Sequence, residues 1–120
     1  MAHRWTLTAN STAATSSAVV TAPAGTVAGV GDPQKKVRVQ GVSFFHGGST
    51  NAAAAGTTTL FTATDNEGNV YALGAGGINP VQGHIQDSDG ILPFNKVYKF
   101  EWTTGSTSFA KGFTAWGDYV

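Results

Sequence analysis

The chain of 120 residues is long enough for one domain with one modest core, and only 12% of its residues are Asp, Glu, Lys or Arg, about half the usual fraction. Its seven basic and seven acidic residues cancel and form no long run of one sign, which argues against nucleic acid as the main ligand. The absence of cysteine excludes disulfides, thiolate zinc sites and cysteine nucleophiles.

A surface with so little charge has two interpretations. Interface cores are depleted of charged residues, so part of the surface is expected to be covered by copies of the chain or by a larger assembly. The alternative is an uncharged surface rich in Ser and Thr hydroxyls. The first residues, Met1–Trp5, lack the apolar core of a signal peptide, and no apolar run approaches the ~20 residues of a membrane span. We therefore expect synthesis in the cytoplasm and no membrane partner.

Residues 1–34 are interpreted as an extended N-terminal arm. The stretch Asn10–Ser17 is small and polar, and glycines and prolines follow from Pro23 onward. Such a segment has little to bury, so it is expected to order on a partner, with possible short edge strands at Val19-Val20 and Thr26-Val27. Deletion of residues 1–20 is expected to leave the domain, residues 35–120, folded but to weaken assembly.

Residues 37–45 predict a core strand, with Gly41 at a position where a bulge switches the buried face. The β-branched run 57–64 and the run 70–73 flank a Gly-containing turn, which is typical of a hairpin. Residues 74–90 predict a loop with at most one short strand, at 81–85. The only helix candidate is 51–55.

The last part of the chain predicts a strand at 97–103, with Tyr98, Phe100 and Trp102 on one aromatic face, and a return strand at 109–116 after a Thr-Gly turn. Short strands at this spacing with Gly-rich turns indicate an all-β fold. We expect an antiparallel β-sandwich or a jelly-roll-like barrel with an extended N-terminal arm.

No motif predicts a catalytic, cofactor or metal site. The glycines from Gly74 to Gly77 precede no helix, so a β-connection explains them better than a phosphate loop. The Asp87-x-Asp89 pair lacks the later ligands of a calcium loop and indicates a turn. The three histidines do not have zinc-ligand spacing, and no Gly-x-Ser-x-Gly elbow occurs. A small hydrolase using two carboxylates remains an alternative to a non-enzymatic role.

The aromatic residues are expected to be mostly core, and those left over are candidates for partner contact because aromatic side chains anchor interfaces. The candidate partner contacts are Trp5, Leu7, Val19, Val20, Trp116 and Tyr119.

Four segments follow a recurring pattern: the strand 36–42, the Gly/Ala/Thr-rich hairpin 57–73, the segment 89–98 and the Thr-Gly turn with the strand after it, 103–116. From Val37 to Trp116, about two-thirds of the chain, the sequence resembles small virion proteins of tailed bacteriophages. The resemblance implies a β-sandwich structural protein of the virion, a capsid decoration (cement) protein on the outer surface of the head. It also implies a homo-oligomer, with a trimer favoured, that binds the major capsid protein or other virion proteins and neither nucleic acid nor a cofactor.

Two other binding roles remain open. One is a structural protein of the phage tail or fibre. The other is a carbohydrate-binding module, in which exposed Trp5, Trp102 or Trp116 would form a stacking platform on one flat face. Burial of Trp102 and Trp116 would count against that platform.

Overall fold

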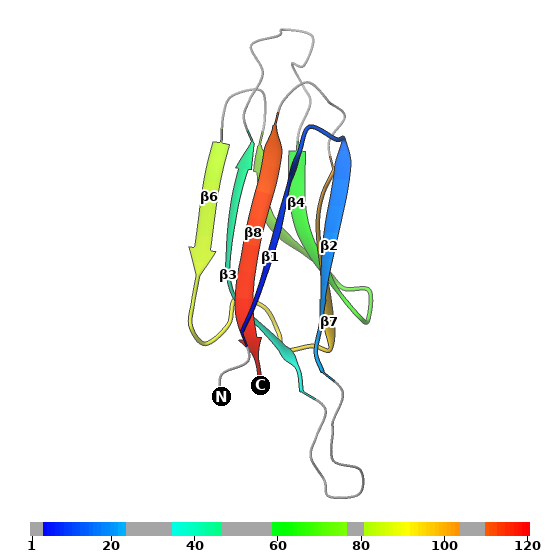
Figure 1. The fold of residues 1–120 in the computed structure, drawn as a ribbon, viewed down its shortest axis with the longest axis vertical. Coiled ribbons are helices and arrows are strands. Elements are labelled where there is room, and N and C mark those ends of the chain that lie inside the picture. Colours follow the sequence, from blue (N-terminus) through cyan, green and yellow to red (C-terminus); the bar gives the residue numbers. More distant parts are fainter. Residues whose placement is uncertain (1–3, 24–34, 47–58, 77–80, 104–109) are drawn as a thin grey trace, which may run out of the picture.

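The computed structural model describes residues 4–23, 35–46, 59–76, 81–103 and 110–120, and within these ranges the chain consists of strands and turns without a helix (Figure 1). No described helix is therefore long and apolar enough to cross a membrane. The strands are β1 (Arg4–Ser11), β2 (Thr15–Thr21), β3 (Val37–His46), β4 (Thr59–Asp65), β5 (Val70–Gly76), β6 (Val81–Gln86), β7 (Val97–Thr103) and β8 (Lys111–Tyr119).

The strands form two antiparallel four-stranded sheets, in the orders β1-β8-β3-β6 and β2-β7-β4-β5. We call them the β8 sheet and the β7 sheet. The strand pairs are nested around the β4-β5 hairpin in the sequence: β3 pairs with β6, β2 pairs with β7, and β1 pairs with β8. This nested pairing across two packed sheets is the jelly-roll arrangement. The predicted β-sandwich is confirmed.

The interpretation of the N-terminal segment as an arm is wrong for residues 4–23. β1 pairs with β8 along its whole length and β2 pairs with β7, so each is an edge strand of one sheet. The physical reason is that alternate residues of a strand point inward. Trp5 and Val20 thereby reach the core although the segments around them contain many polar residues. The edge strand expected at Val19-Val20 is present, whereas Thr26-Val27 lies outside the described residues.

The core lies between the sheets and is largely aromatic. Tyr98, Phe100 and Trp102 of β7 are all buried, which confirms the predicted aromatic face. The Trp102 ring meets Phe113 of the opposite sheet edge-on, with ring centroids 5.8 Å apart at an interplanar angle of 77°, a favoured geometry for aromatic pairs. Phe61 of β4 similarly stacks on a phenylalanine of β3, at a centroid distance of 4.8 Å.

The expected bulge in β3 is confirmed, because the register between β3 and β8 shifts between Val39 and Gly41. Val37 and Val39 point inward before the shift, and Val42 and Phe44 point inward after it. The bulge therefore decides which side chains of β3 remain on the outer face of the β8 sheet.

The other predicted elements are largely present. The β4-β5 hairpin and the strand β6 are confirmed, and the Asp87–Asp89 segment is a turn in which Asp89 N donates to Asp87 Oδ1 over 2.9 Å. β5 continues to Gly76, which was expected to be loop, because Gly74 without a side chain leaves room for the Phe44 ring. The helix candidate 51–55, Phe109 and the turn 104–107 lie outside the described residues.

Candidate functional site

The structure does not bring the six predicted contact residues together. Trp5 and Val20 are only 7% and 4% exposed, and the Trp5 indole Nε1 donates a hydrogen bond to Asp118 O over 3.0 Å. Leu7 and Tyr119 are partly buried and pack against the core. These four side chains are therefore used within the fold.

The two remaining candidates lie on opposite faces of the sandwich. Val19 is exposed on the outer face of the β7 sheet, opposite Lys99 in the pairing of β2 with β7. Trp116 is partly exposed on the outer face of the β8 sheet, where its neighbours Ala115 and Gly117 point inward. No single surface can include both.

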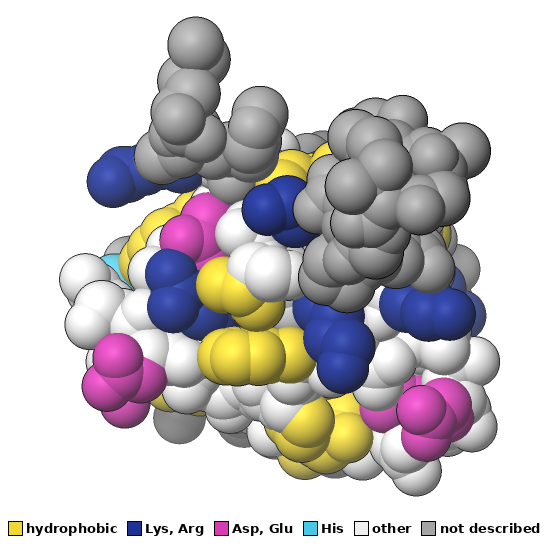
Figure 2. Space-filling model, turned by 90° about the horizontal axis from the view of Figure 1, so that it is seen from below, with side chains coloured by type: hydrophobic (Ala, Val, Ile, Leu, Met, Phe, Trp, Pro, Cys, Tyr) yellow, Lys and Arg dark blue, Asp and Glu magenta, His cyan; other side chains and the backbone are white. Residues whose placement is uncertain are grey.

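A different surface lies at the end of the sandwich where β1 begins and β8 ends. Phe94 is 45% exposed and Val120 is 40% exposed, and each has a lysine close to it in the backbone pairing or in the sequence. The backbone of Val120 exchanges two hydrogen bonds with Lys36, of 2.8 and 2.9 Å, and Lys96 follows Phe94 by two residues. Seen from this end, hydrophobic side chains lie between Lys and Arg side chains (Figure 2). We call Lys36, Phe94, Lys96 and Val120 the terminal patch.

The segment that carries Phe94 is fixed by hydrogen bonds on both sides. Val37 N donates to Asn95 O over 2.7 Å, and the Tyr98 hydroxyl donates to Pro93 O. Asn95 Nδ2 also donates to the Asp65 carboxylate over 3.0 Å. Phe94 is therefore presented on a braced segment, which reduces the entropy lost when a partner binds.

Asp65 is the centre of this bracing. Its carboxylate also accepts hydrogen bonds from Glu67 N, from Asn69 N and Nδ2, and from the Tyr71 hydroxyl. Burial by itself raises the pKa of Asp65, but the hydrogen bonds from Asn69, Glu67 and Tyr71 outweigh it, so the pKa lies below its ordinary value. The carboxylate thus holds the β4-β5 turn and the segment before β7 in one arrangement.

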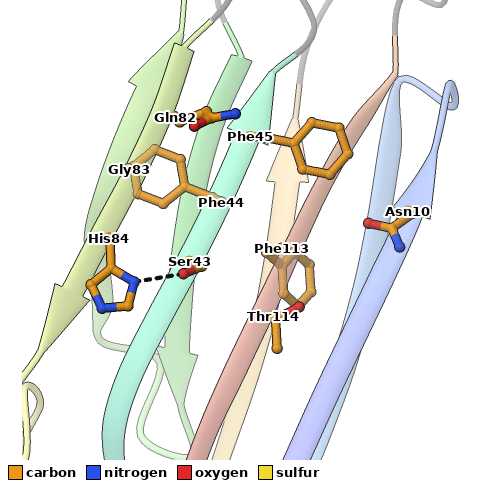
Figure 3. Close-up of a pocket in the computed structure, with 9 residues that line it drawn as sticks. All are labelled: Asn10, Ser43, Phe44, Phe45, Gln82, Gly83, His84, Phe113 and Thr114. Atoms are coloured by element: carbon orange, nitrogen blue, oxygen red, sulfur yellow. Dashed lines mark hydrogen bonds between the residues drawn. The ribbon is translucent and has the colours of Figure 1, made fainter.

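The outer face of the β8 sheet has two aromatic rings that lie against glycines. The Trp116 indole covers Gly41, and the Phe45 ring covers Gly112, since a Cβ atom at either glycine would overlap the ring. Phe45 extends from β3 across β8 toward Asn10 of β1 (Figure 3). Covering a sheet glycine with an aromatic ring from a neighbouring strand is a known way of stabilising a sheet.

Polar side chains fill the rows between these rings. Ser43 Oγ lies 2.7 Å from His84 Nδ1, and His84 Nε2 lies 3.0 Å from Gln86 Oε1. Because Gln86 Oε1 can only accept, His84 Nε2 donates to it, and Nδ1 is bonded to the Ser43 hydroxyl, which can donate or accept. In the next pair along that row, the hydroxyl oxygens of Thr8 and Thr114 are 3.3 Å apart.

This face is hollowed in two places that follow one another along β6 and β8. The larger hollow has a volume of about 430 Å³ and is lined by residues that include Asn10, Phe45, Gln82 and His84 (Figure 3). The smaller, of about 190 Å³, is lined by residues that include Trp116 and Gln86. We call the two together the outer groove. Of its aromatic and amide residues, the sequence analysis selected only Trp116.

Four acidic residues of the described ranges have structural partners: Asp65, Asp87, Glu101 and Asp118. Asp118 makes a two-pronged ion pair with Arg38, with distances of 2.7 and 2.6 Å, and this guanidinium lowers the pKa of Asp118 below its ordinary value. Glu101 lies 3.5 Å from Lys99. Within the part of the chain that the structure describes, no group of three or more His, Asp or Glu side chains is placed to hold a metal ion.

No protein-family model matches the sequence, and a search of curated proteins gave no match.

Proposed function

We propose that the chain is a non-enzymatic structural protein of a phage virion, and that its terminal patch binds the outer surface of the head as a capsid decoration protein does. The observation that carries this proposal is that two exposed apolar residues, Phe94 and Val120, lie at one end of the sandwich, where Val120 pairs through its backbone with Lys36 and Lys96 follows Phe94 by two residues. An apolar centre with a charged rim is the usual anatomy of a protein interface, and a braced aromatic side chain is a typical energetic anchor.

The fold and the composition support the same role. Jelly rolls are frequent among viral capsid domains and lectins, although a fold alone does not specify a function. The low charge of the chain, 12%, fits a protein whose surface is covered in an assembly. Binding as a homotrimer would let three patches of modest affinity act together on a symmetric shell.

A structural role in the phage tail or fibre would require a similar protein-binding surface. Only a binding experiment distinguishes that role from capsid decoration. The carbohydrate-binding platform considered from the sequence would consist of Trp5, Trp102 and Trp116. Trp5 and Trp102 are buried, so neither can stack on a sugar. An aromatic surface that includes Trp116 is considered separately below.

The test is co-sedimentation of the purified protein with empty heads and with isolated tails of its source phage. The decisive variant is Phe94→Ser, and its matched control is Leu60→Ser, because Leu60 is 43% exposed and lies at the other end of the sandwich. Binding to heads that is lost with Phe94→Ser and kept with Leu60→Ser supports the proposal. Absence of head binding by the unmodified protein overturns it, and binding to tails instead favours the alternative.

A further inference from the structure

We propose that the outer groove of the β8 sheet binds a neutral oligosaccharide, as a second binding function that does not depend on the terminal patch. The two surfaces have no residue in common, since the groove lies on the outer face of the β8 sheet and the patch is formed by Lys36, Phe94, Lys96 and Val120 at the end of the sandwich.

The aromatic side chains provide two stacking positions. Each ring lies with one side on a glycine, Phe45 on Gly112 and Trp116 on Gly41, which holds it against the sheet. The electron-rich face of an aromatic ring attracts the partly positive C–H groups on the face of a sugar ring. Gly112 and Trp116 are four residues apart on β8, or ~13 Å at the rise of a strand. A ligand that engages both rings is therefore a chain of several sugars.

The polar side chains of the groove match sugar hydroxyl groups. Asn10 and Gln82 are exposed amides that can both donate and accept, Gln86 has its amide nitrogen as a donor while its oxygen binds His84, and a sugar hydroxyl also donates and accepts. Binding sites for small molecules combine apolar lining with a few placed polar groups in this way.

The lack of charge selects a neutral ligand. Among the residues that line the larger hollow there is no Asp, Glu, Lys or Arg, and Arg4 is the one charged residue lining the smaller hollow. An acidic or phosphorylated sugar would need several charged partners to replace its hydration. The larger hollow, which includes Phe45 and Gln82, has no such charged partner.

The groove is also organised before a ligand binds. Ser43 and Gln86 hold the two nitrogens of His84, and the His84 ring lies 5.6 Å from the Trp116 ring at an interplanar angle of 36°. Side chains that are already fixed lose less conformational entropy on binding. This arrangement joins the two hollows into one line of contacts.

The test is isothermal titration calorimetry of the full chain with four neutral hexasaccharides: cellohexaose, maltohexaose, mannohexaose and the hexamer of N-acetylglucosamine. Tryptophan emission gives a second readout, because Trp5 and Trp102 are buried and Trp116 lines the groove. We expect saturable binding of at least one hexasaccharide with a change in emission, and much weaker binding of the corresponding monosaccharide.

Two variants separate binding from folding. Phe45→Ala and Gln82→Ala are each expected to weaken the affinity at least tenfold, and Gln82→Ala to leave the melting temperature unchanged because the side chain is exposed. Leu60→Ser, on the other sheet, is the control that keeps full affinity. No binding of any of the four at millimolar concentration overturns the inference, as does equal binding by all three variants. Gln82→Ala is expected to bind phage heads normally whether or not it binds sugar, because Gln82 is not part of the terminal patch. The sugar-binding result is therefore independent of the proposed head binding.

Discussion

The Trp116 indole lies directly on Gly41, in a position that a Cβ atom at residue 41 would occupy. Gly41 is also the residue at which the register between β3 and β8 shifts. The same glycine thus has two roles. It lies at the bulge where the alternation of inward and outward side chains in β3 shifts by one residue, and it leaves room for the Trp116 ring on the outer face of the β8 sheet.

Replacement of Gly41 by Ala is therefore expected to displace Trp116 and to lower the free energy of unfolding by about 1–3 kcal/mol, the usual cost of overpacking. Urea unfolding measures it. In a Trp116→Ala background the same replacement has no ring to displace, so its effect is expected to shrink to a fraction of that value. If Gly41→Ala lowers the free energy of unfolding equally with and without Trp116, the destabilisation comes from the backbone at residue 41 and not from a clash with the ring.

Phe100→Ala is expected to destabilise the fold by about 3–5 kcal/mol, because it removes a buried ring from the centre of the core. The Phe100 ring centroid lies 6.0 Å from that of Trp5 and 6.2 Å from that of Phe113, so the replacement removes two contacts between the β7 sheet and the β8 sheet. Phe94→Ala is the control, an exposed phenylalanine whose loss is expected to change stability by less than about 1 kcal/mol. An unchanged melting temperature for Phe100→Ala contradicts the assigned core.

Deletion of residues 1–20 is now expected to abolish cooperative unfolding, contrary to the expectation from the sequence. The deletion removes β1 and most of β2 and takes Trp5 and Val20 out of the core. It also leaves β8 and β7 without their edge partners. Calorimetry of the truncated chain measures the transition. A sharp transition at the original temperature would restore the arm interpretation.

The stability of the fold is expected to fall in acid partly through Asp65. Its pKa is lower in the folded protein than the ordinary value of 3.8, so the folded state favours the ionised carboxylate. This contribution is complete above about pH 5, declines as the pH falls through 3.8, and is lost below the folded pKa.

The check is urea unfolding between pH 6 and pH 2 for the unmodified protein and for Asp65→Asn. The variant has no carboxylate to titrate at this position, so its stability is expected to be lower at pH 6 and to depend less on pH. Parallel pH profiles for the two proteins would show that Asp65 does not contribute.

The sequence predicted the strands wherever alternation was strong, as in β3 and β7, and it predicted the bulge because glycine interrupted that alternation. It did not predict β1, and it predicted β2 only as a possible short edge strand at Val19-Val20, because the segment Asn10–Ser17 carries little apolar surface. Their placement depends on pairing with β7 and β8, which are distant in the chain. Pairing between distant segments overrides weak local preference.

The candidate surfaces were harder to predict for a related reason. Phe44 and Phe45 are adjacent, and composition does not tell which one points outward; the bulge at Gly41 settles this by turning Phe44 inward. Phe94 is exposed because the segment before β7 is held by Asn95 and Tyr98, which are contacts that the sequence does not reveal.

The most direct test of the proposed function is the co-sedimentation of the chain with empty heads of its source phage, compared between Phe94→Ser and Leu60→Ser. The account predicts that the unmodified protein and Leu60→Ser sediment with the heads and that Phe94→Ser stays in the supernatant. Equal sedimentation of the two variants, or none by the unmodified protein, would contradict the claim that the terminal patch is the surface that binds the capsid.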